Sequence, residues 1–324
     1  MKTILITGIN GYLGSQLAKR YSKGYKIIGL EYSKDNLFRL EGESFELFES
    51  KDGIPDEIFQ KHTIDCVIHT ATFYGRDEES DSKMLYTNTY LSQLLLEKLT
   101  VSGCRLFINT DTVLDRFTSS YALTKKQFRD WLQFYSKSGK MKVVNLELEH
   151  FYGPGTSTTN FITLMTRKML RNEKTIRLTK GEQNRDFLYI DDLLQVYDIM
   201  IKNKNNFSKF EIFYVGAGIN TNLKYILQYL KKHTSSSSKL DLRLANIKLV
   251  DALLYLHVKD SEGNFYVGVD AFVVIWRQLP YFRYLNFIIT LPIIYCLAKF
   301  IYKKFAKYRF SKLEHCQIAF KNRE

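Results

Sequence analysis

Short apolar runs alternate with longer amphipathic segments through the first two-thirds of the chain. The runs are rich in β-branched side chains, as is typical of buried strands, and the segments between them show helical spacing. This alternation predicts an α/β fold, a Rossmann-type doubly wound parallel sheet with cofactor and substrate at the carboxyl ends of its strands. Strands are predicted over residues 3–7, 25–30, 64–69, 105–109 and 141–148, and helices over 15–21, 81–99 and 120–136.

A glycine pattern directly follows the first predicted strand. Gly8, Gly11 and Gly14 form Gly-x-x-Gly-x-x-Gly and lead into the first predicted helix. Such glycines permit a tight turn, a close approach of the backbone to a pyrophosphate, and close packing of helix on strand. The amino end of the helix then receives the phosphate charge. The pattern therefore predicts a dinucleotide site, for NAD or NADP.

The second predicted strand ends near Glu31, where an acidic side chain would bind the adenosine ribose hydroxyls. This favours NAD. Ser33, Lys34 and Arg39 follow closely and could hold a 2′-phosphate, so NADP stays open.

Tyr121 and Lys125 lie one helical turn apart and should project from the same helix face. Reduction of a ketone needs a proton donor at the developing alkoxide, and an adjacent ammonium together with a nicotinamide ring would lower the pKa of a tyrosine. Thr112, at the end of the preceding strand, is expected to polarise the substrate carbonyl, with Thr110 as the alternative and Asp111 as local scaffold. The same Tyr-x-x-x-Lys spacing recurs at Tyr255, Tyr295 and Tyr308, so the strand context singles out Tyr121.

Residues 1–235 resemble the extended short-chain dehydrogenase/reductase family, also called the NAD-dependent epimerase/dehydratase family. The resemblance implies that Tyr121 is the general acid/base, Thr112 its partner at the sugar, and Lys125 a ligand of the nicotinamide ribose. The matching motifs are residues 7–14, 69–71, Asn88, Thr112, Tyr121/Lys125, 151–155 and 185–192. The cofactor residues it implies are Gly8, Asn10, Gly11, Tyr12, Leu13, Gly14, Glu31, Thr70, Ala71, Asn88 and Lys125.

The same resemblance implies a nucleotide-sugar substrate and a homodimer. Arg185 matches the arginine that grips the substrate pyrophosphate, and His150 and Asn160 are expected to line the sugar site. Residues 109–112 and 149–153 resemble the CDP-abequose synthase branch, which reduces C4 of a CDP-linked 4-keto-3,6-dideoxyhexose. Reductase and epimerase chemistry both stay open, as do the sugar and its nucleotide.

The tail, residues 236–324, follows a serine run that suggests a linker. It resembles the C-terminal half of the thiol-disulfide oxidoreductase DCC family but lacks that family's Cys-x-x-Cys. We therefore expect a mainly helical half-domain without dithiol chemistry, and a truncated substrate lid in the first domain. The alternative function is a non-catalytic dinucleotide-binding or degraded fusion protein.

The charge and the cysteines of the chain limit which classes of partner and which kinds of site are expected. The formal net charge is +13, and residues 239–324 carry 14 basic and 7 acidic side chains. No base-reading motif accompanies this charge, so a nucleic-acid partner is not expected, whereas an anionic substrate or acidic lipid headgroups fit. Residues 284–302 are interrupted by Asn286, Pro292 and Lys299, which counts against a membrane span. A buried amphipathic helix of the tail is expected, with a peripheral helix at a membrane surface as the alternative. The four scattered cysteines indicate no metal site, and no secretory signal is evident, so a cytoplasmic enzyme is expected.

Overall fold

The computed structural model describes residues 2–75, 80–241, 255–259, 265–278 and 289–312. The chain divides into two compact units, one of residues 1–176 and 181–239, the other of 177–180 and 240–324. Residues 284–288 of the predicted tail helix and Cys316 lie outside the described residues.

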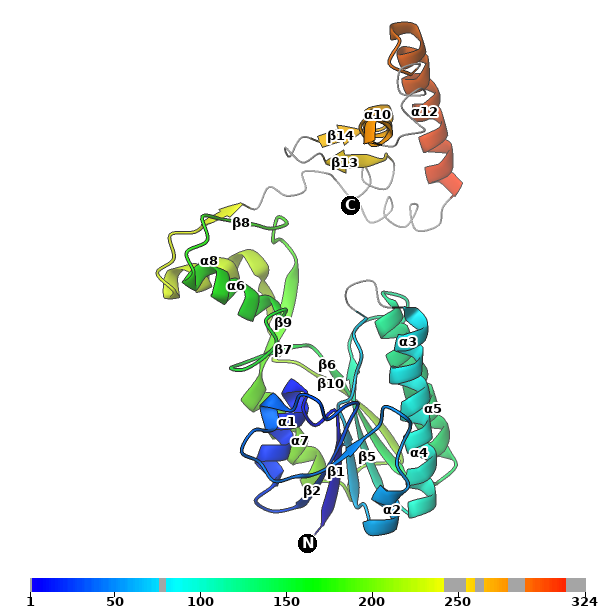
Figure 1. The fold of residues 1–324 in the computed structure, drawn as a ribbon, viewed down its shortest axis with the longest axis vertical. Helices are drawn as coiled ribbons and strands as arrows, with labels where there is room; N and C mark the ends of the chain where they lie inside the picture. The colour runs from blue at the N-terminus through cyan, green and yellow to red at the C-terminus, as the bar shows by residue number, and fades with distance from the viewer. Residues whose placement is uncertain (1, 76–79, 242–254, 260–264, 279–288, 313–324) are drawn as a thin grey trace. The chain divides into compact units, whose positions relative to one another are not determined.

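The first unit is built on a seven-stranded sheet whose paired strands all run parallel, in the order β10-β6-β5-β4-β1-β2-β3. This confirms the predicted Rossmann-type fold (Figure 1). The order reverses direction at β1, which places the crevice for a ligand beside the strand that the glycine turn follows. The strands are β1 (Thr3–Thr7), β2 (Lys26–Glu31), β3 (Glu46–Glu49), β4 (Cys66–His69), β5 (Leu106–Thr112), β6 (Lys142–Leu148) and β10 (Phe210–Val215).

Helices cover both faces of the sheet (Figure 1). On one face Leu17 and Tyr197 join the core formed with β1, and on the other Leu95 and Phe128 join the core formed with β4 and β5. The first face carries α1 (Tyr12–Tyr21), the 3₁₀ turn η1 (Phe38–Leu40) and α7 (Ile190–Lys202). The second carries α2 (Glu57–Lys61), α3 (Asp81–Leu85), the π-helical turn η2 (Tyr86–Tyr90), α4 (Leu91–Ser102) and α5 (Ser120–Lys137).

A smaller portion of the first unit follows β6 and β10. A three-stranded sheet, β11-β9-β7, joins β7 (His150–Tyr152), β9 (Asn184–Tyr189) and β11 (Asn220–Asn222), and α6 (Phe161–Leu170) lies against α8 (Leu223–His233). Short strands β8 (Thr175–Arg177) and β12 (Lys239–Asp241) lie where the two units divide. The serine run predicted as a linker is packed, because Ser236 and Ser238 are buried and the Ser237 N–H donates to Asn172 Oδ1 over 2.9 Å.

The second unit contains an antiparallel pair, β13 (His257–Lys259) and β14 (Phe265–Val267), with α10 (Val269–Gln278) and α12 (Pro292–Lys312). Tyr302 of α12 contacts the Phe272 ring on α10, and its hydroxyl accepts the Leu256 N–H over 2.9 Å. Among the described residues, no helix has both the length and the apolar character needed to cross a membrane.

Candidate active site

A cavity of about 970 Å³ opens at the carboxyl ends of the central strands. Its walls come from the glycine turn, from the ends of β2, β4 and β5, from α5 and from the residues that follow β6, all within the first unit. A volume of this size suits a dinucleotide with part of a second ligand.

The glycine turn forms one end of the cavity. Gly8 has φ +64°, and a Cβ on Gly14 would lie 2.2 Å from the Gly8 carbonyl oxygen. Neither position therefore accepts a larger side chain. Helix α1 starts directly after Gly11, which has no side-chain cap, so the first N–H groups of the helix are available to an anion. Gly8, Gly11, Tyr12, Leu13 and Gly14 all line the cavity, as the sequence predicted.

Glu31 and Arg39 both line the cavity, at the end where the adenosine of the cofactor is expected. The Glu31 carboxylate accepts the N–H groups of Asn10 over 2.8 Å and Tyr32 over 3.1 Å, and burial raises its pKa. Arg39 lies 4.4 Å over the Phe38 ring, and burial lowers its pKa. Asn10 does not line the cavity but orients Glu31, and neither Ser33 nor Lys34 belongs to the wall.

Thr112, Tyr121 and Lys125 line the same cavity as the glycine turn. Ser119 caps the start of helix α5, because its Oγ accepts the Ala122 N–H over 3.2 Å. This cap fixes the position on the helix from which the Tyr121 side chain projects. Thr112 ends β5, and its Oγ1 accepts the Leu114 N–H over 3.2 Å. The alternative residue Thr110 also borders the cavity, but its hydroxyl is paired with the Tyr197 hydroxyl at 2.6 Å.

The surroundings shift the pKa values of Tyr121 and Lys125 in opposite directions. Burial raises the pKa of Tyr121, with Tyr74 adding to the effect through a ring stacked 5.0 Å away. Lys125 is not among the groups that shift this pKa, so the lowering expected from the neighbouring ammonium is not seen and desolvation dominates. Burial lowers the pKa of Lys125 to about 8, although the Asp111 carboxylate opposes this. A protonated phenol beside this lysine suits a general acid.

The segment after β4 forms the wall beside the glycine turn, where Ala71 lies against Gly8 and Thr70 against Gly14. Thr70 Oγ1 donates to the Thr7 carbonyl over 2.7 Å, and the Ala71 N–H donates to Thr7 Oγ1 over 3.2 Å. Asn88, expected to bind cofactor, instead lies behind this wall, where its amide bonds both the N–H and the carbonyl of Phe73. Thr72, Phe73 and Tyr74 also line the cavity, and the sequence did not predict them. Only the fold brings them close to Tyr121.

Two of the three predicted substrate residues line the cavity, and the third does not. His150 and Asn160 line the cavity, and Asn160 also starts α6 by accepting the Ile162 N–H over 3.1 Å. Arg185 does not line it, because this residue is exposed on β9 with its guanidinium donating to the Asn184 carbonyl over 3.0 Å. The pyrophosphate contact implied for Arg185 therefore stays a prediction.

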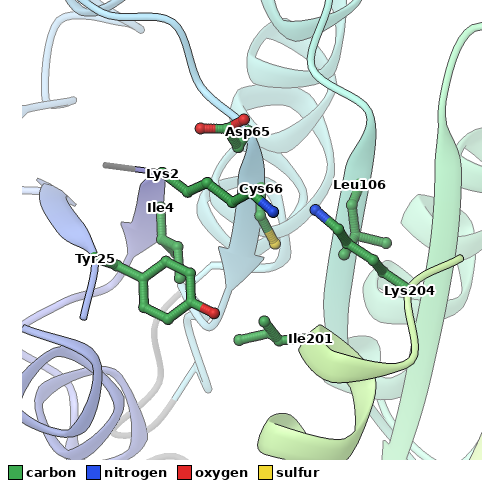
Figure 2. A pocket seen from close by; sticks show the side chains of 8 residues that line it. All are labelled: Lys2, Ile4, Tyr25, Asp65, Cys66, Leu106, Ile201 and Lys204. Atoms are coloured by element: carbon green, nitrogen blue, oxygen red, sulfur yellow. The ribbon is translucent and has the colours of Figure 1, made fainter.

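The rest of the described chain offers little competing chemistry. A second cavity, of about 40 Å³, lies at the amino ends of the strands, with Lys2, Asp65 and Cys66 on its wall (Figure 2). It is too small for a cofactor. Within the described residues no cluster of histidine, cysteine or acidic side chains could hold a metal ion.

Comparisons with known proteins agree with this geometry. The chain is 30% identical over 251 residues to CDP-abequose synthase of Salmonella muenchen, covering 74% of this chain and 83% of that protein. It is 24% identical over 257 residues to dTDP-4-dehydro-6-deoxyglucose reductase of Escherichia coli, covering 70% and 80%. Its fold resembles the UDP-glucose 4-epimerase of Thermotoga maritima, with a TM-score of 0.64, 22% identity and coverage of 74% and 84%.

Two family matches divide the sequence near the end of the first unit. Residues 227–314 match the DCC1-like thiol-disulfide oxidoreductase family, as the tail's resemblance predicted. Residues 4–216, which contain the glycine turn and every residue discussed at the cavity, match the NAD dependent epimerase/dehydratase family. This chain belongs to the NAD dependent epimerase/dehydratase family.

Proposed function

We propose that this protein reduces the 4-keto group of a nucleotide-linked deoxysugar with a nicotinamide cofactor, and that the nucleotide is CDP. The observation that carries the proposal is that Thr112, Tyr121 and Lys125 share one cavity with the glycine turn. The similarity to CDP-abequose synthase and to a dTDP-4-keto sugar reductase supports reduction over epimerisation.

The residues present fit a dinucleotide. The open N–H groups at the start of α1 suit a pyrophosphate, and the space beside Gly8 and Gly14 tolerates no side chain. Lys125, buried and reaching the cavity from α5, would hold the nicotinamide ribose. When bound, the reduced cofactor supplies a hydride to the substrate carbonyl carbon.

The chain's own groups then handle the proton. The Tyr121 phenol, kept protonated by burial, donates its proton to the carbonyl oxygen as that oxygen gains negative charge. The Thr112 hydroxyl donates a hydrogen bond to the same oxygen and stabilises the developing alkoxide. The lysine ammonium lowers the cost of the phenolate that results, and solvent returns the proton.

We propose NAD in preference to NADP. The Glu31 carboxylate stands where the adenosine ribose hydroxyls are expected, and its charge would repel a 2′-phosphate. Arg39 is already engaged with the Phe38 ring and with the carbonyl of Gly155 at 3.4 Å.

We also propose a homodimer and a peripheral lipid contact, each supported by a separate surface. Exposed aromatic pairs lie on the helices of one sheet face, Tyr86 with Tyr90 on η2 and Trp131 with Phe134 on α5. On α12, exposed apolar side chains lie beside basic ones, with no acidic residue in the helix.

The catalytic proposal is tested by mixing the protein with NADH and CDP-, dTDP- or UDP-linked 4-keto-6-deoxysugars and following the nicotinamide absorbance. We expect turnover that is fastest with CDP, and a kcat lowered about 10²- to 10⁴-fold in Tyr121→Phe because the general acid is lost. Tyr214→Phe, which changes a tyrosine that is 79% exposed, is the matched control and should keep the wild-type rate.

Absence of turnover with every sugar, or an unchanged rate in Tyr121→Phe, would contradict the proposal. If NADH then raised the melting temperature while no sugar nucleotide raised it further, the non-catalytic dinucleotide-binding alternative would hold.

A further inference from the structure

The face of β5 and β6 that lies under α5 is polar where an apolar surface would be expected. Asn109 pairs in register with Asn145, and Asp111 with Glu147, so all four side chains point to the same face of the sheet. All four are at most 3% exposed. We call these four residues, with Lys126 and Arg129 of α5, the α5 polar cluster.

Hydrogen bonds join the cluster from end to end. The Asn109 amide donates to Asn145 Oδ1 over 2.7 Å, and the Asn145 amide donates to Asp111 Oδ2 over 3.0 Å. Lys126 Nζ lies 3.3 Å from Asp111 Oδ2 and 2.5 Å from Glu147 Oε1, and Arg129 Nη1 also donates to Glu147 over 2.5 Å. Two carboxylates are thus matched by two cations.

This network ends at Thr112. The Thr112 N–H donates to Asp111 Oδ1 over 2.8 Å, and its carbonyl accepts from Lys126 Nζ over 2.5 Å. Both backbone groups of the threonine are therefore held by one buried ion pair. Since Lys126 follows Lys125 on α5, the same ammonium ties the end of β5 to the helix that carries Tyr121 and Lys125.

Stability alone gives a weak reason for such a cluster, because well-packed apolar side chains often replace a buried ion pair without loss. The cluster is also coupled to the site by charge. Burial is the main cause that lowers the pKa of Lys125, Asp111 on β5 opposes it, and Lys126 on its own helix adds to it. From β4 the remaining titratable neighbour is His69, kept neutral because burial lowers its pKa.

We propose that Lys126 is a positioning residue, which holds the Thr112 backbone to α5 so that the threonine hydroxyl, the Tyr121 phenol and the Lys125 ammonium meet at one point of the cavity. The inference rests on the proposed function for its effect on rate. Lys126 itself does not line the cavity.

The first test compares Lys126→Met, Lys126→Arg and Arg129→Met. We expect Lys126→Met to lower kcat about 10- to 100-fold, as a misplaced catalytic group does, while the Kd for NADH stays within about twofold of wild type. Lys126→Arg should recover most of the loss. Arg129→Met is the matched control: Arg129 shares Glu147 with Lys126 but has no hydrogen bond to Asp111 or Thr112 among the described contacts, so its kcat should match wild type.

A second readout needs no substrate. In protein carrying ¹³Cε-labelled lysine, the titration of Lys125 should move upward by about one pH unit in Lys126→Met, because a cation is lost and Asp111 is left uncompensated. It should stay in place in Arg129→Met. If wild type turns over no sugar, the proposed function fails, whereas an unmoved Lys125 titration in Lys126→Met would separately overturn the coupling of Lys126 to the site.

Should Lys126→Met not fold, the double variant Lys126→Met with Glu147→Gln takes its place in the test. It removes one buried positive charge and one buried negative charge. The loss of kcat should persist, because the Thr112 carbonyl still lacks its donor. Wild-type kcat together with an unmoved Lys125 titration in Lys126→Met, or wild-type kcat in the double variant, would overturn the proposal, and so would an equal loss in Arg129→Met.

Discussion

At the scale of single residues, His69 makes a prediction about pH. Its imidazole is buried at the end of β4, within 2.8 Å of the Thr7 hydroxyl and 3.1 Å of the Ser92 hydroxyl, and burial lowers its pKa well below the ordinary value. Below pH 6.5 His69 therefore binds a proton in the unfolded chain but stays neutral in the folded protein. We expect the free energy of unfolding to fall by about 1.4 kcal/mol per pH unit as pH drops from 6.5 toward 5.

Urea unfolding at pH 7, 6 and 5.5 measures this slope. His69→Gln should be less stable throughout and should lose most of the slope, whereas His233→Gln, at an exposed position of α8, should keep it. An equal slope in all three proteins would show that the buried imidazole is not responsible.

Residues whose role depends on local spacing were the ones that the sequence predicted. Tyr121 and Lys125 follow from one helical turn, and the glycines from one strand-to-helix turn. Arg185 and Asn88 were placed by resemblance, and neither lines the cavity; the Arg185 guanidinium bonds to Asn184 and the Asn88 amide to Phe73. The role of Lys126 depends on β6, a partner distant in sequence.

At the scale of elements, α12 predicts binding to an anionic lipid surface. Its apolar side chains at positions 294, 297, 301, 305 and 308 recur at helical spacing and are between 37% and 64% exposed. Lys303, Lys304 and Lys307 lie in the same helix. Such a helix inserts its apolar stripe while its cations bind acidic headgroups.

Co-sedimentation with vesicles tests this helix. We expect binding to phosphatidylglycerol vesicles that falls with added salt, and little binding to phosphatidylcholine vesicles. Leu297→Glu with Ile301→Glu should abolish it, and Leu170→Glu, on α6 and 62% exposed, should not. Equal binding by all variants would contradict the assignment of the surface to α12.

The strands β1, β2, β4, β5 and β6 were predicted to within a few residues because buried parallel strands read as continuous apolar runs. Strand β5 runs three residues beyond its predicted end, since Thr110, Asp111 and Thr112 continue the ladder with β6 despite their polarity. The strands β3 and β10 of the large sheet and β7, β9 and β11 of the small one were not predicted, because they are only partly buried and do not read as continuous apolar runs.

At the scale of the whole molecule, the resemblance predicted a dimer and the exposed aromatic pairs on η2 and α5 offer the surface. We expect sedimentation velocity to show a dimer, and Trp131→Glu with Phe134→Glu to show a monomer because paired chains would bury four carboxylates, two from each chain. NADH binding should survive, as neither residue lines the cavity. Phe117→Glu, at a position 82% exposed outside these helices, is the control. A monomeric wild type would contradict the prediction.

The account depends most on hydride delivery to the carbonyl carbon beside Tyr121. The direct measurement uses NADH with deuterium at both C4 positions of the nicotinamide and a CDP-4-keto-6-deoxysugar, followed by mass spectrometry and NMR of the product. We predict one deuterium, bound to C4 of the sugar, formed by wild type and by Tyr214→Phe and strongly slowed in Tyr121→Phe. A product without deuterium, or with deuterium at another carbon, would contradict the central claim.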